Sequence, residues 1–203
     1  MGVTLMIKRL LISVFILFVS LISFEIVSAQ ETITVMNATL PSGRFYLSCA
    51  EDSTTYKIYC FGGYDGNILD QIVKYDPSND NLTIQNSILP TPRRRLSCAE
   101  NSATNKIYCF GGIGGTSAGS QIVEYNPSSD TLLIKSATLP SPRHTLSCAE
   151  NSETHSIYCF GGQDSSTSSY LNQILEYNPS TDILVVKSAT IPGGGEGISC
   201  SEL

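Results

Sequence analysis

The most informative segment of the sequence is FYLSCAEDSTTYKIYCFGG, from Phe45 to Gly63. Apolar and polar residues alternate from Phe45 to Ala50, and the segment from Lys57 to Phe61 has the composition of a second short strand. Between them Asp52-Ser53-Thr54 supplies turn residues, and a pair of glycines closes the stretch. The pattern therefore predicts two short antiparallel strands joined by a turn.

The same stretch recurs along the chain at an almost constant spacing. Its first cysteine appears at intervals of 49, 50 and 52 residues, as Cys49, Cys98, Cys148 and Cys200. Each full unit starts at Leu-Ser-Cys and ends at Leu-Pro or Ile-Pro, which gives Leu47–Pro90, Leu96–Pro140 and Leu146–Pro192. Repeats of this length indicate an array or a propeller.

Two more strand signals complete each unit. In the first unit they span Gln71–Tyr75 and Leu82–Gln85, with turn residues before and between them. Four short antiparallel strands, repeated radially, make a β-propeller blade. The sequence after residue 29 shows no helical period. We therefore expect an all-β fold of four-stranded propeller blades, three complete and one split or incomplete, at about 42–90, 91–140 and 141–192, with a further blade starting at 193–203.

Three repeated features surround the glycine pair. It follows an Ile-Tyr strand, a Val/Leu-x-Tyr-Asn/Asp-Pro strand comes next, and an arginine follows the Leu-Pro end. The tyrosines are Tyr75, Tyr125 and Tyr177, and the arginines are Arg44, Arg93 and Arg143. Over roughly residues 33–203 this pattern resembles the kelch repeat, except that the usual tryptophan is replaced by Leu82, Leu132 and Leu184. The resemblance implies a β-propeller, which in that family closes with about five to seven blades.

The repeat count leaves such a propeller incomplete. Ile33–Pro41 matches Leu82–Pro90, so the chain after residue 29 begins with a last strand and ends in a first strand. Because a propeller needs closure to protect its edges, three and a half blades leave apolar surface exposed. We expect a truncated gene product. The alternative is self-association, in which chains pair through the incomplete propeller edges to complete a ring.

The first 29 residues have the pattern of a secretory signal peptide. Lys8 and Arg9 precede an uncharged run from Leu10 to Phe24, and Val27-Ser28-Ala29 places small residues where a signal peptidase cuts. The alternative is an uncleaved anchor over Leu10–Ala29, which is long enough to span a bilayer. Both interpretations place residues 30–203, the kelch-repeat part, outside the cytosol. The protein is therefore expected to be secreted or on the cell surface.

The charge of the chain excludes one class of partner. Its formal net charge is −6, and charged residues make up only 15% of it. Non-specific binding to nucleic acid or to an anionic membrane needs a basic face. We therefore expect no nucleic-acid partner, and no membrane contact beyond the N-terminal anchor just described.

Each unit carries two cysteines 11 residues apart, which the hairpin pattern places opposite each other. Cross-strand neighbours come within disulfide distance, and an exported protein meets an oxidising compartment. We expect three disulfides, between Cys49 and Cys60, Cys98 and Cys109, and Cys148 and Cys159. The alternatives are six reduced, buried thiols or a zinc site, for which no repeated histidine is present. Cys200 corresponds to the first cysteine of a fourth pair.

Length variation is confined to one end of the blades. In a four-stranded meander the second-to-third and fourth-to-first connections emerge together, at what we call the loop end; the opposite end is the turn end. The segments that vary in length are Tyr64–Asp70, Ile113–Ser120 and Gln163–Asn172. Variable loops on a rigid scaffold are the usual place for function, although neutral variation is the alternative.

Cationic and aromatic residues gather at the loop end. We take as candidate binding residues Arg44, Arg93, Arg94, Arg95, Arg143, Tyr64 and Tyr170. Guanidinium groups hold carboxylates bidentately, as in an acidic peptide or an acidic sugar. The alternative for the once-per-blade arginines is bonding to loop carbonyls of their own fold, whereas Arg94 and Arg95 are not repeated. The turn end is expected to be acidic, with Glu51, Asp52, Asp76, Asp80, Glu100, Asp130, Glu150, Glu153 and Asp182.

These features favour an exported binding or scaffold protein that recognises a protein or a carbohydrate. The rival class is a fragment of a kelch-propeller enzyme acting on sugars, similar to sialic-acid mutarotases or copper radical oxidases, that lacks its catalytic residues. A copper site needs two histidines, but His144 and His155 are expected at opposite ends of one blade, as solvated turn residues. We therefore predict no catalytic residue, cofactor or metal.

Two sequons, Asn37-Ala38-Thr39 and Asn81-Leu82-Thr83, are candidate glycosylation sites. Asn81 lies in a predicted turn and is the better candidate. Asn126 and Asn178 are each followed by proline, which excludes them.

Overall fold

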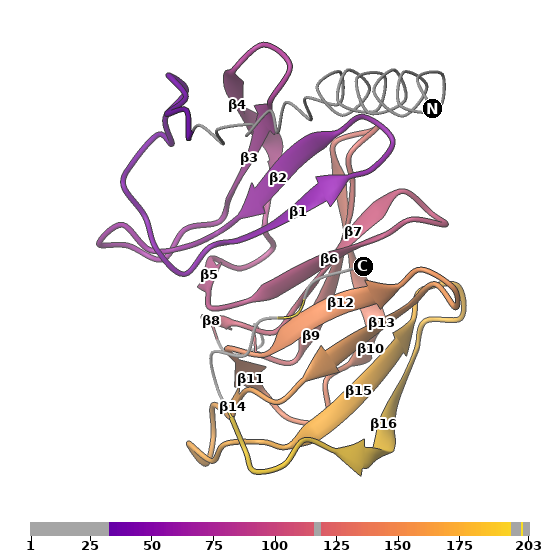
Figure 1. Ribbon diagram of the computed structural model, residues 1–203. Coiled ribbons are helices and arrows are strands. Elements are labelled where there is room, and N and C mark those ends of the chain that lie inside the picture. Colours follow the sequence, from indigo (N-terminus) through magenta and orange to yellow (C-terminus); the bar gives the residue numbers. More distant parts are fainter. Residues whose placement is uncertain (1–32, 116–118, 196–199, 201–203) are drawn as a thin grey trace, which may run out of the picture. The chain divides into compact units, whose positions relative to one another are not determined.

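The computed structural model describes residues 33–115, 119–195 and 200. Three four-stranded antiparallel sheets follow one another along the chain (Figure 1). Blade 1 is β1 (Ser48–Asp52), β2 (Lys57–Phe61), β3 (Gln71–Asp76) and β4 (Asn81–Ile88). Blade 2 is β6 (Ser97–Asn101), β7 (Lys106–Phe110), β9 (Gln121–Asn126) and β10 (Thr131–Thr138). Blade 3 is β12 (Ser147–Asn151), β13 (Ser156–Phe160), β15 (Gln173–Asn178) and β16 (Ile183–Thr190).

This architecture confirms the predicted all-β fold of four-stranded blades. The described part of the chain contains no α-helix, and therefore none that is long and apolar enough to cross a bilayer. The predicted leader, residues 1–29, lies outside the described residues.

The strand boundaries differ from the prediction at two places in each blade, and Ile33–Pro41, expected as a last strand, forms no strand. The first strand was expected from Phe45, but β1 starts at Ser48 because Tyr46 has a φ of 61°, outside the β region. Arg95 and Thr145 take the same conformation before β6 and β12, with φ of 58° and 53°. The fourth strand runs on to Ile88, and Asn81 begins it instead of lying in a turn.

The cysteine pairs lie where the hairpin register predicted. Cys49 is the register partner of Cys60 across β1 and β2, and the other two blades repeat the pairing. All three pairs are joined as disulfides, and the remaining cysteine, Cys200, is free. Disulfides are typical of proteins outside the cytosol, so the three bonds are consistent with an extracellular protein.

We expect peptide mapping without reduction to recover Cys49–Cys60, Cys98–Cys109 and Cys148–Cys159 as linked peptides. The physical reason is that all three pairs are direct cross-strand neighbours, with Cα atoms 4.0–4.1 Å apart. Closing a loop of this length stabilises the fold by about 2–3 kcal/mol, so reduction is expected to lower the midpoint of thermal unfolding. Recovery of mostly free thiols from protein made through a secretory route would contradict the prediction.

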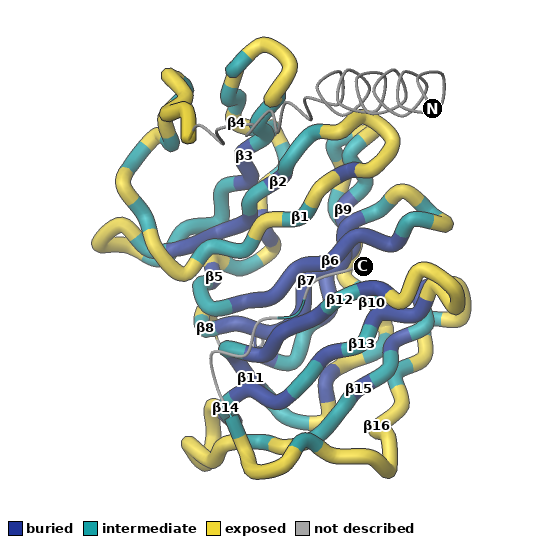
Figure 2. Tube along the Cα trace, viewed as in Figure 1, coloured by how far each residue is buried: buried dark blue, intermediate teal, exposed yellow. Residues whose placement is uncertain are grey.

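Adjacent blades share apolar clusters. We call the face that a blade turns toward the next blade its leading face, and the opposite face its rear face. Between blades 1 and 2, the leading face of blade 1 contributes Tyr59 and Phe61. The rear face of blade 2 contributes Tyr125 and the Cys98–Cys109 disulfide. The ring centroid of Tyr125 lies 5.4 Å from that of Tyr59 and 5.5 Å from that of Phe61. In Figure 2 the deepest burial accordingly follows the strands of blade 2, which has a neighbour on both sides.

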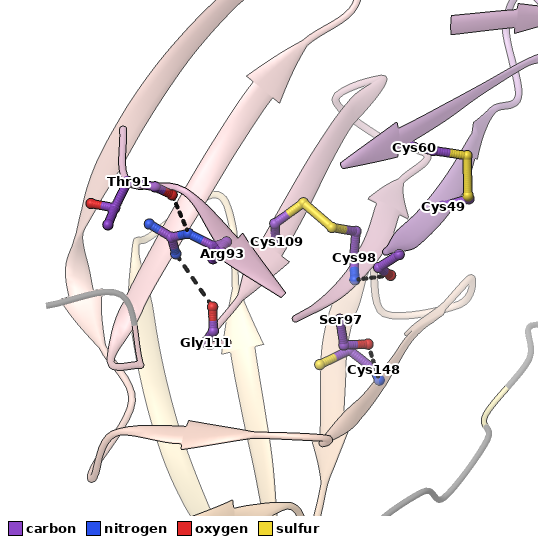
Figure 3. Close-up of a disulfide and its surroundings, with 10 residues drawn as sticks. Cys49, Cys60, Thr91, Arg93, Ser97, Cys98, Cys109, Gly111 and Cys148 are labelled. Carbon is purple, nitrogen blue, oxygen red and sulfur yellow. Dashed lines mark hydrogen bonds between the residues drawn. A yellow bond between two sulfur atoms is a disulfide. The ribbon is translucent and has the colours of Figure 1, made fainter. Parts of the chain in front are cut away.

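The first strands of successive blades are also joined by a repeated hydrogen bond. Ser48 Oγ accepts from the backbone N–H of Cys98 at 2.9 Å, and Ser97 Oγ accepts from that of Cys148 at 3.0 Å (Figure 3). Ser147 Oγ accepts in the same way from the N–H of Cys200 at 2.8 Å. The serine of the Leu-Ser-Cys motif therefore links each blade to the next.

Acidic residues of the turn end also link neighbouring blades. Glu100 is buried and its Oε1 accepts from the backbone N–H and the hydroxyl of Ser53 in blade 1, at 2.9 and 3.0 Å. Glu150 is buried as well and accepts from the N–H of Ser102 in blade 2. Neither glutamate contributes to an open acidic surface, because each satisfies the turn of the preceding blade.

Aspartates complete these links. Asp130 accepts from the N–H of Asn86 and Asp182 from that of Ser136, each at 2.9 Å, so each bonds the fourth strand of the preceding blade. Burial opposes ionisation of Asp182, but hydrogen bonds from Ser136 and from the Tyr177 hydroxyl outweigh it and lower the pKa of the carboxyl.

The outermost faces of blades 1 and 3 are less covered. On the rear face of blade 1 Cys49 is exposed, whereas its counterpart Cys98 is buried. On the leading face of blade 3 Phe160 is only half-buried, whereas Phe61 and Phe110 are fully buried. Among the described residues the blades do not close a ring. Self-association through these faces stays a prediction.

Candidate functional site

Short ribbons hold the two kinds of connection together at the loop end. β5 (Arg93–Arg94) pairs with β8 (Ile113–Gly114), and β11 (Arg143–His144) pairs with β14 (Gln163–Asp164). In blade 1 a single bridge between Phe45 and Tyr64 takes their place. Each fourth-to-first connection therefore lies beside a variable loop, as the meander topology predicted.

The once-per-blade arginines are held by their own fold. Arg93 Nε donates to the carbonyl of Thr91 at 3.2 Å, and Nη1 donates to that of Gly111 at 3.3 Å (Figure 3). Its Nη2 donates to Gln121 Oε1 at 2.6 Å. Arg143 bonds in the same way to the carbonyl two residues earlier and to Gln173, which starts the third strand of its blade. Arg44 does so with the carbonyl two residues earlier and with Gln71.

The carbonyls of Arg93 and Arg143 each contact the glycine pair of the preceding blade. The Arg143 carbonyl accepts from the Gly112 N–H at 3.0 Å, and a Cβ at Gly111 would lie 2.3 Å from its oxygen. Gly111 also has a φ of 62°, so both space and backbone conformation require glycine there. The repeated arginine and the glycine pair thus form one structural unit between neighbouring blades.

This arrangement corrects part of the candidate binding set. Arg93 and Arg143 are 0% and 1% exposed, so they do not present free donors at the loop end, while Arg44 is half-buried. Burial lowers the pKa of the Arg93 guanidinium to about 10, and it lowers that of Arg143 as well. The groups remain cationic at neutral pH and act within the fold.

The two residues that follow each repeated arginine are not themselves repeated, and their side chains differ from blade to blade. They are Phe45 and Tyr46 in blade 1, Arg94 and Arg95 in blade 2, and His144 and Thr145 in blade 3. Backbone hydrogen bonds join the second residue of each pair to that of the next blade. The Arg95 N–H donates to the Tyr46 carbonyl, and the Thr145 N–H donates to the Arg95 carbonyl. The fold therefore brings together three positions at which the side chains differ from blade to blade.

In blades 1 and 2 these residues form an aromatic–arginine cluster of Phe45, Tyr46, Tyr64, Arg94 and Arg95. The ring centroid of Phe45 lies 4.6 Å from that of Tyr46 and 5.4 Å from that of Tyr64. Arg94 Cζ lies 4.7 Å from the Tyr64 centroid, and Arg95 Cζ lies 4.3 Å from the Tyr46 centroid. Phe45 and Tyr46 remain 51% and 41% exposed.

The guanidinium groups of this cluster lack the Nε bond that the repeated arginines make, although Arg143 also has one buried nitrogen, Nη1, without a partner among the described residues. Arg94 Nε and Arg95 Nε are buried and have no hydrogen-bond acceptor among the described residues. None of the ion pairs found in the described part of the chain involves Arg94 or Arg95. The nearby loop carboxylate of Asp65 instead accepts from Ser42 Oγ, at 2.8 Å. The cluster is therefore a cationic site that has no carboxylate partner among the described residues.

The remaining candidates lie elsewhere. Tyr170 is 54% exposed in the loop of blade 3, outside the cluster. The loop Ile113–Ser120 includes residues 116–118, which lie outside the described residues. Asn37 and Asn81 are both exposed, and glycosylation at either stays a prediction.

His144 differs from its prediction as a solvated turn residue. It is 6% exposed and, with Asp164, lines a pocket of about 320 Å³ between the loops of blades 2 and 3. Hydrogen bonds from Ser141 and from the backbone of the following turn lower the pKa of Asp164. In the described part of the chain no three histidine, cysteine or acidic side chains gather as a metal site.

The blades and their repeated contacts define a β-propeller repeat protein. The chain matches the family described as the KLHDC2/KLHL20/DRC7 Kelch-repeats domain over residues 16–184, and it belongs to that family. This confirms the resemblance of the repeats, and membership indicates a protein-interaction scaffold. No curated protein matches the chain.

Sequence reasoning found three members of the cluster and missed two. Tyr64, Arg94 and Arg95 were candidates, whereas Phe45 and Tyr46 were assigned to a strand. The signal that identifies them is repeat alignment, because they occupy the same positions after a repeated arginine as Arg94 and Arg95.

Proposed function

We propose that the protein is an exported, non-enzymatic interaction module that binds a protein or carbohydrate partner at its loop end. The observation that carries the proposal is the aromatic–arginine cluster. It combines half-exposed aromatic rings with two cations that lack a carboxylate partner among the described residues. Aromatic and arginine side chains are the residue types that contribute most to binding energy in protein interfaces.

The distribution of polar contacts also favours the loop end as the binding surface. At the turn end Glu100, Glu150, Asp130 and Asp182 are engaged in bonds between blades. At the loop end the side chains of the cluster vary between repeats while the backbone beneath them is fixed. Export is supported by the three disulfides, since reducing conditions in the cytosol disfavour them.

The experiment is a binding screen of immobilised peptides and glycans with two matched variants. We expect the Phe45→Ala/Arg94→Ala/Arg95→Ala variant to lose at least about tenfold in affinity for whatever ligand the screen finds, since each side chain is part of the exposed cluster. The Tyr56→Ala/Glu153→Ala variant removes an exposed ring and an exposed charge at the turn end and should bind normally. Loss of binding only in the second variant, or no ligand at all, would contradict the proposal.

A further inference from the structure

Resting on the proposed function, we propose that the aromatic–arginine cluster is a binding site for a carboxylated sugar residue. Its side chains supply the two elements that such a sugar requires. A sugar ring presents an apolar C–H face that packs on aromatic rings, and its carboxylate takes paired N–H donors.

The aromatic element is provided by two exposed rings of blade 1. Phe45 packs edge-on against both Tyr46 and Tyr64, with interplanar angles of 64° and 73°. The bridge between Phe45 and Tyr64 fixes the backbone under these rings, with N···O distances of 3.1 and 2.9 Å. A site held rigidly in this way loses little side-chain entropy when a ligand binds.

The cationic element comes from blade 2. Arg94 and Arg95 lie over tyrosine rings, and stacking occupies the face of a guanidinium while its in-plane N–H donors remain able to form hydrogen bonds. Arg95 Nη2 uses one donor on the Tyr46 hydroxyl, at 3.0 Å. The repeated arginines satisfy Nε with a carbonyl, but Arg94 and Arg95 have no such acceptor among the described residues. No ion pair among the described residues gives Arg94 or Arg95 a carboxylate, so the carboxylate of a ligand is the partner that suits them.

The backbone at the cluster argues against an acidic peptide. A peptide brings its own N–H and C=O groups, which need partners once they lose water. The main-chain groups that would serve are already used: Phe45 and Tyr64 bond each other, and the Tyr46 and Arg95 carbonyls accept from the next blade. A sugar has no backbone to pair, and its hydroxyls outside the cluster remain in water.

The test is titration calorimetry of the full chain with four probes of matched length. They are tetragalacturonate, its methyl ester, cellotetraose and tetraglutamate. We expect tetragalacturonate to bind, and the methyl ester and cellotetraose to bind at least tenfold more weakly because the carboxylates are masked or absent. Raising the salt concentration should weaken binding of tetragalacturonate, because its contact with the arginines is partly electrostatic.

Variants separate the two elements of the site. Arg94→Lys keeps a charge but removes the paired donors, and we expect it to lose at least fivefold in affinity for tetragalacturonate. Phe45→Ala should lower the affinity for tetragalacturonate by a similar factor. Lys74→Ala and Tyr56→Ala are the matched controls for charge and for ring, because both lie outside the cluster, and neither should change affinity.

The outcomes distinguish this inference from the proposed function. If tetraglutamate binds as tightly as tetragalacturonate and depends on the same residues, the ligand class is wrong while the loop-end module stands. If tetragalacturonate does not bind, or binds equally to Arg94→Lys and Phe45→Ala, the inference is overturned. In that case a different ligand from the wider screen that depends on the cluster would still support the proposed function.

Discussion

Replacing Arg93 with alanine is expected to destabilise the protein by about 3 kcal/mol, whereas the same change at the adjacent Arg94 should cost less than about 1 kcal/mol. Arg93 is fully buried and its guanidinium donates to Thr91, Gly111 and Gln121. Removing it leaves those acceptors without a donor in a site closed to water, which is the costly case for a hydrogen bond. Arg94 lies over the half-buried ring of Tyr64 and near the exposed ring of Tyr46, and it has fewer bonds to lose.

Urea denaturation followed by circular dichroism measures both variants. Arg93→Lys is the matched control, and it should recover little stability because an ammonium group cannot reproduce the forked geometry of three separate bonds. The ligand titrations should show the opposite ranking, with Arg94 the more important of the two. Equal losses of stability for Arg93→Ala and Arg94→Ala would refute the division between a structural and a binding arginine.

Replacing Phe110 with alanine is expected to cost about 3–5 kcal/mol, and the equivalent change at Phe160 less than half as much. Phe110 is 0% exposed and packs against Tyr177 of blade 3, with ring centroids 5.7 Å apart. The truncation therefore opens a cavity between two blades. Phe160 occupies the same position on blade 3, but its face is only half-buried, so less surface and less packing are lost.

The repeat makes this comparison well controlled, because residue type, strand and register are the same in both variants. Phe61→Ala is a second test, since Phe61 is buried against Tyr125 and should behave like Phe110. The measurement is again the free energy of unfolding in urea. A cost for Phe160→Ala equal to that for Phe110→Ala would mean that the leading face of blade 3 is covered in solution, for example by self-association.

Local patterns in the sequence were enough to predict the blades and the disulfides. Strand order depends on local alternation and turn residues, and the repetition of one pattern three times removed the ambiguity of short apolar runs. The pairing of Cys49 with Cys60 followed from the same local information, because the position and length of the turn set the register of the two strands that it joins. The loop end also followed, since a meander places alternate connections together.

The contacts between blades, by contrast, were needed to distinguish the arginine that belongs to the fold from those that belong to the site. Residues 93, 94 and 95 are all arginines, so residue type does not distinguish them. The ribbon of β5 and β8 directs Arg93 inward and leaves Arg94 and Arg95 near the rings of blade 1. The same is true of Glu100 and Glu150, which resemble surface charges until the preceding blade places its turn against them. Burial and contacts between blades depend on residues about fifty positions apart, and no local pattern of the chain encodes that distance.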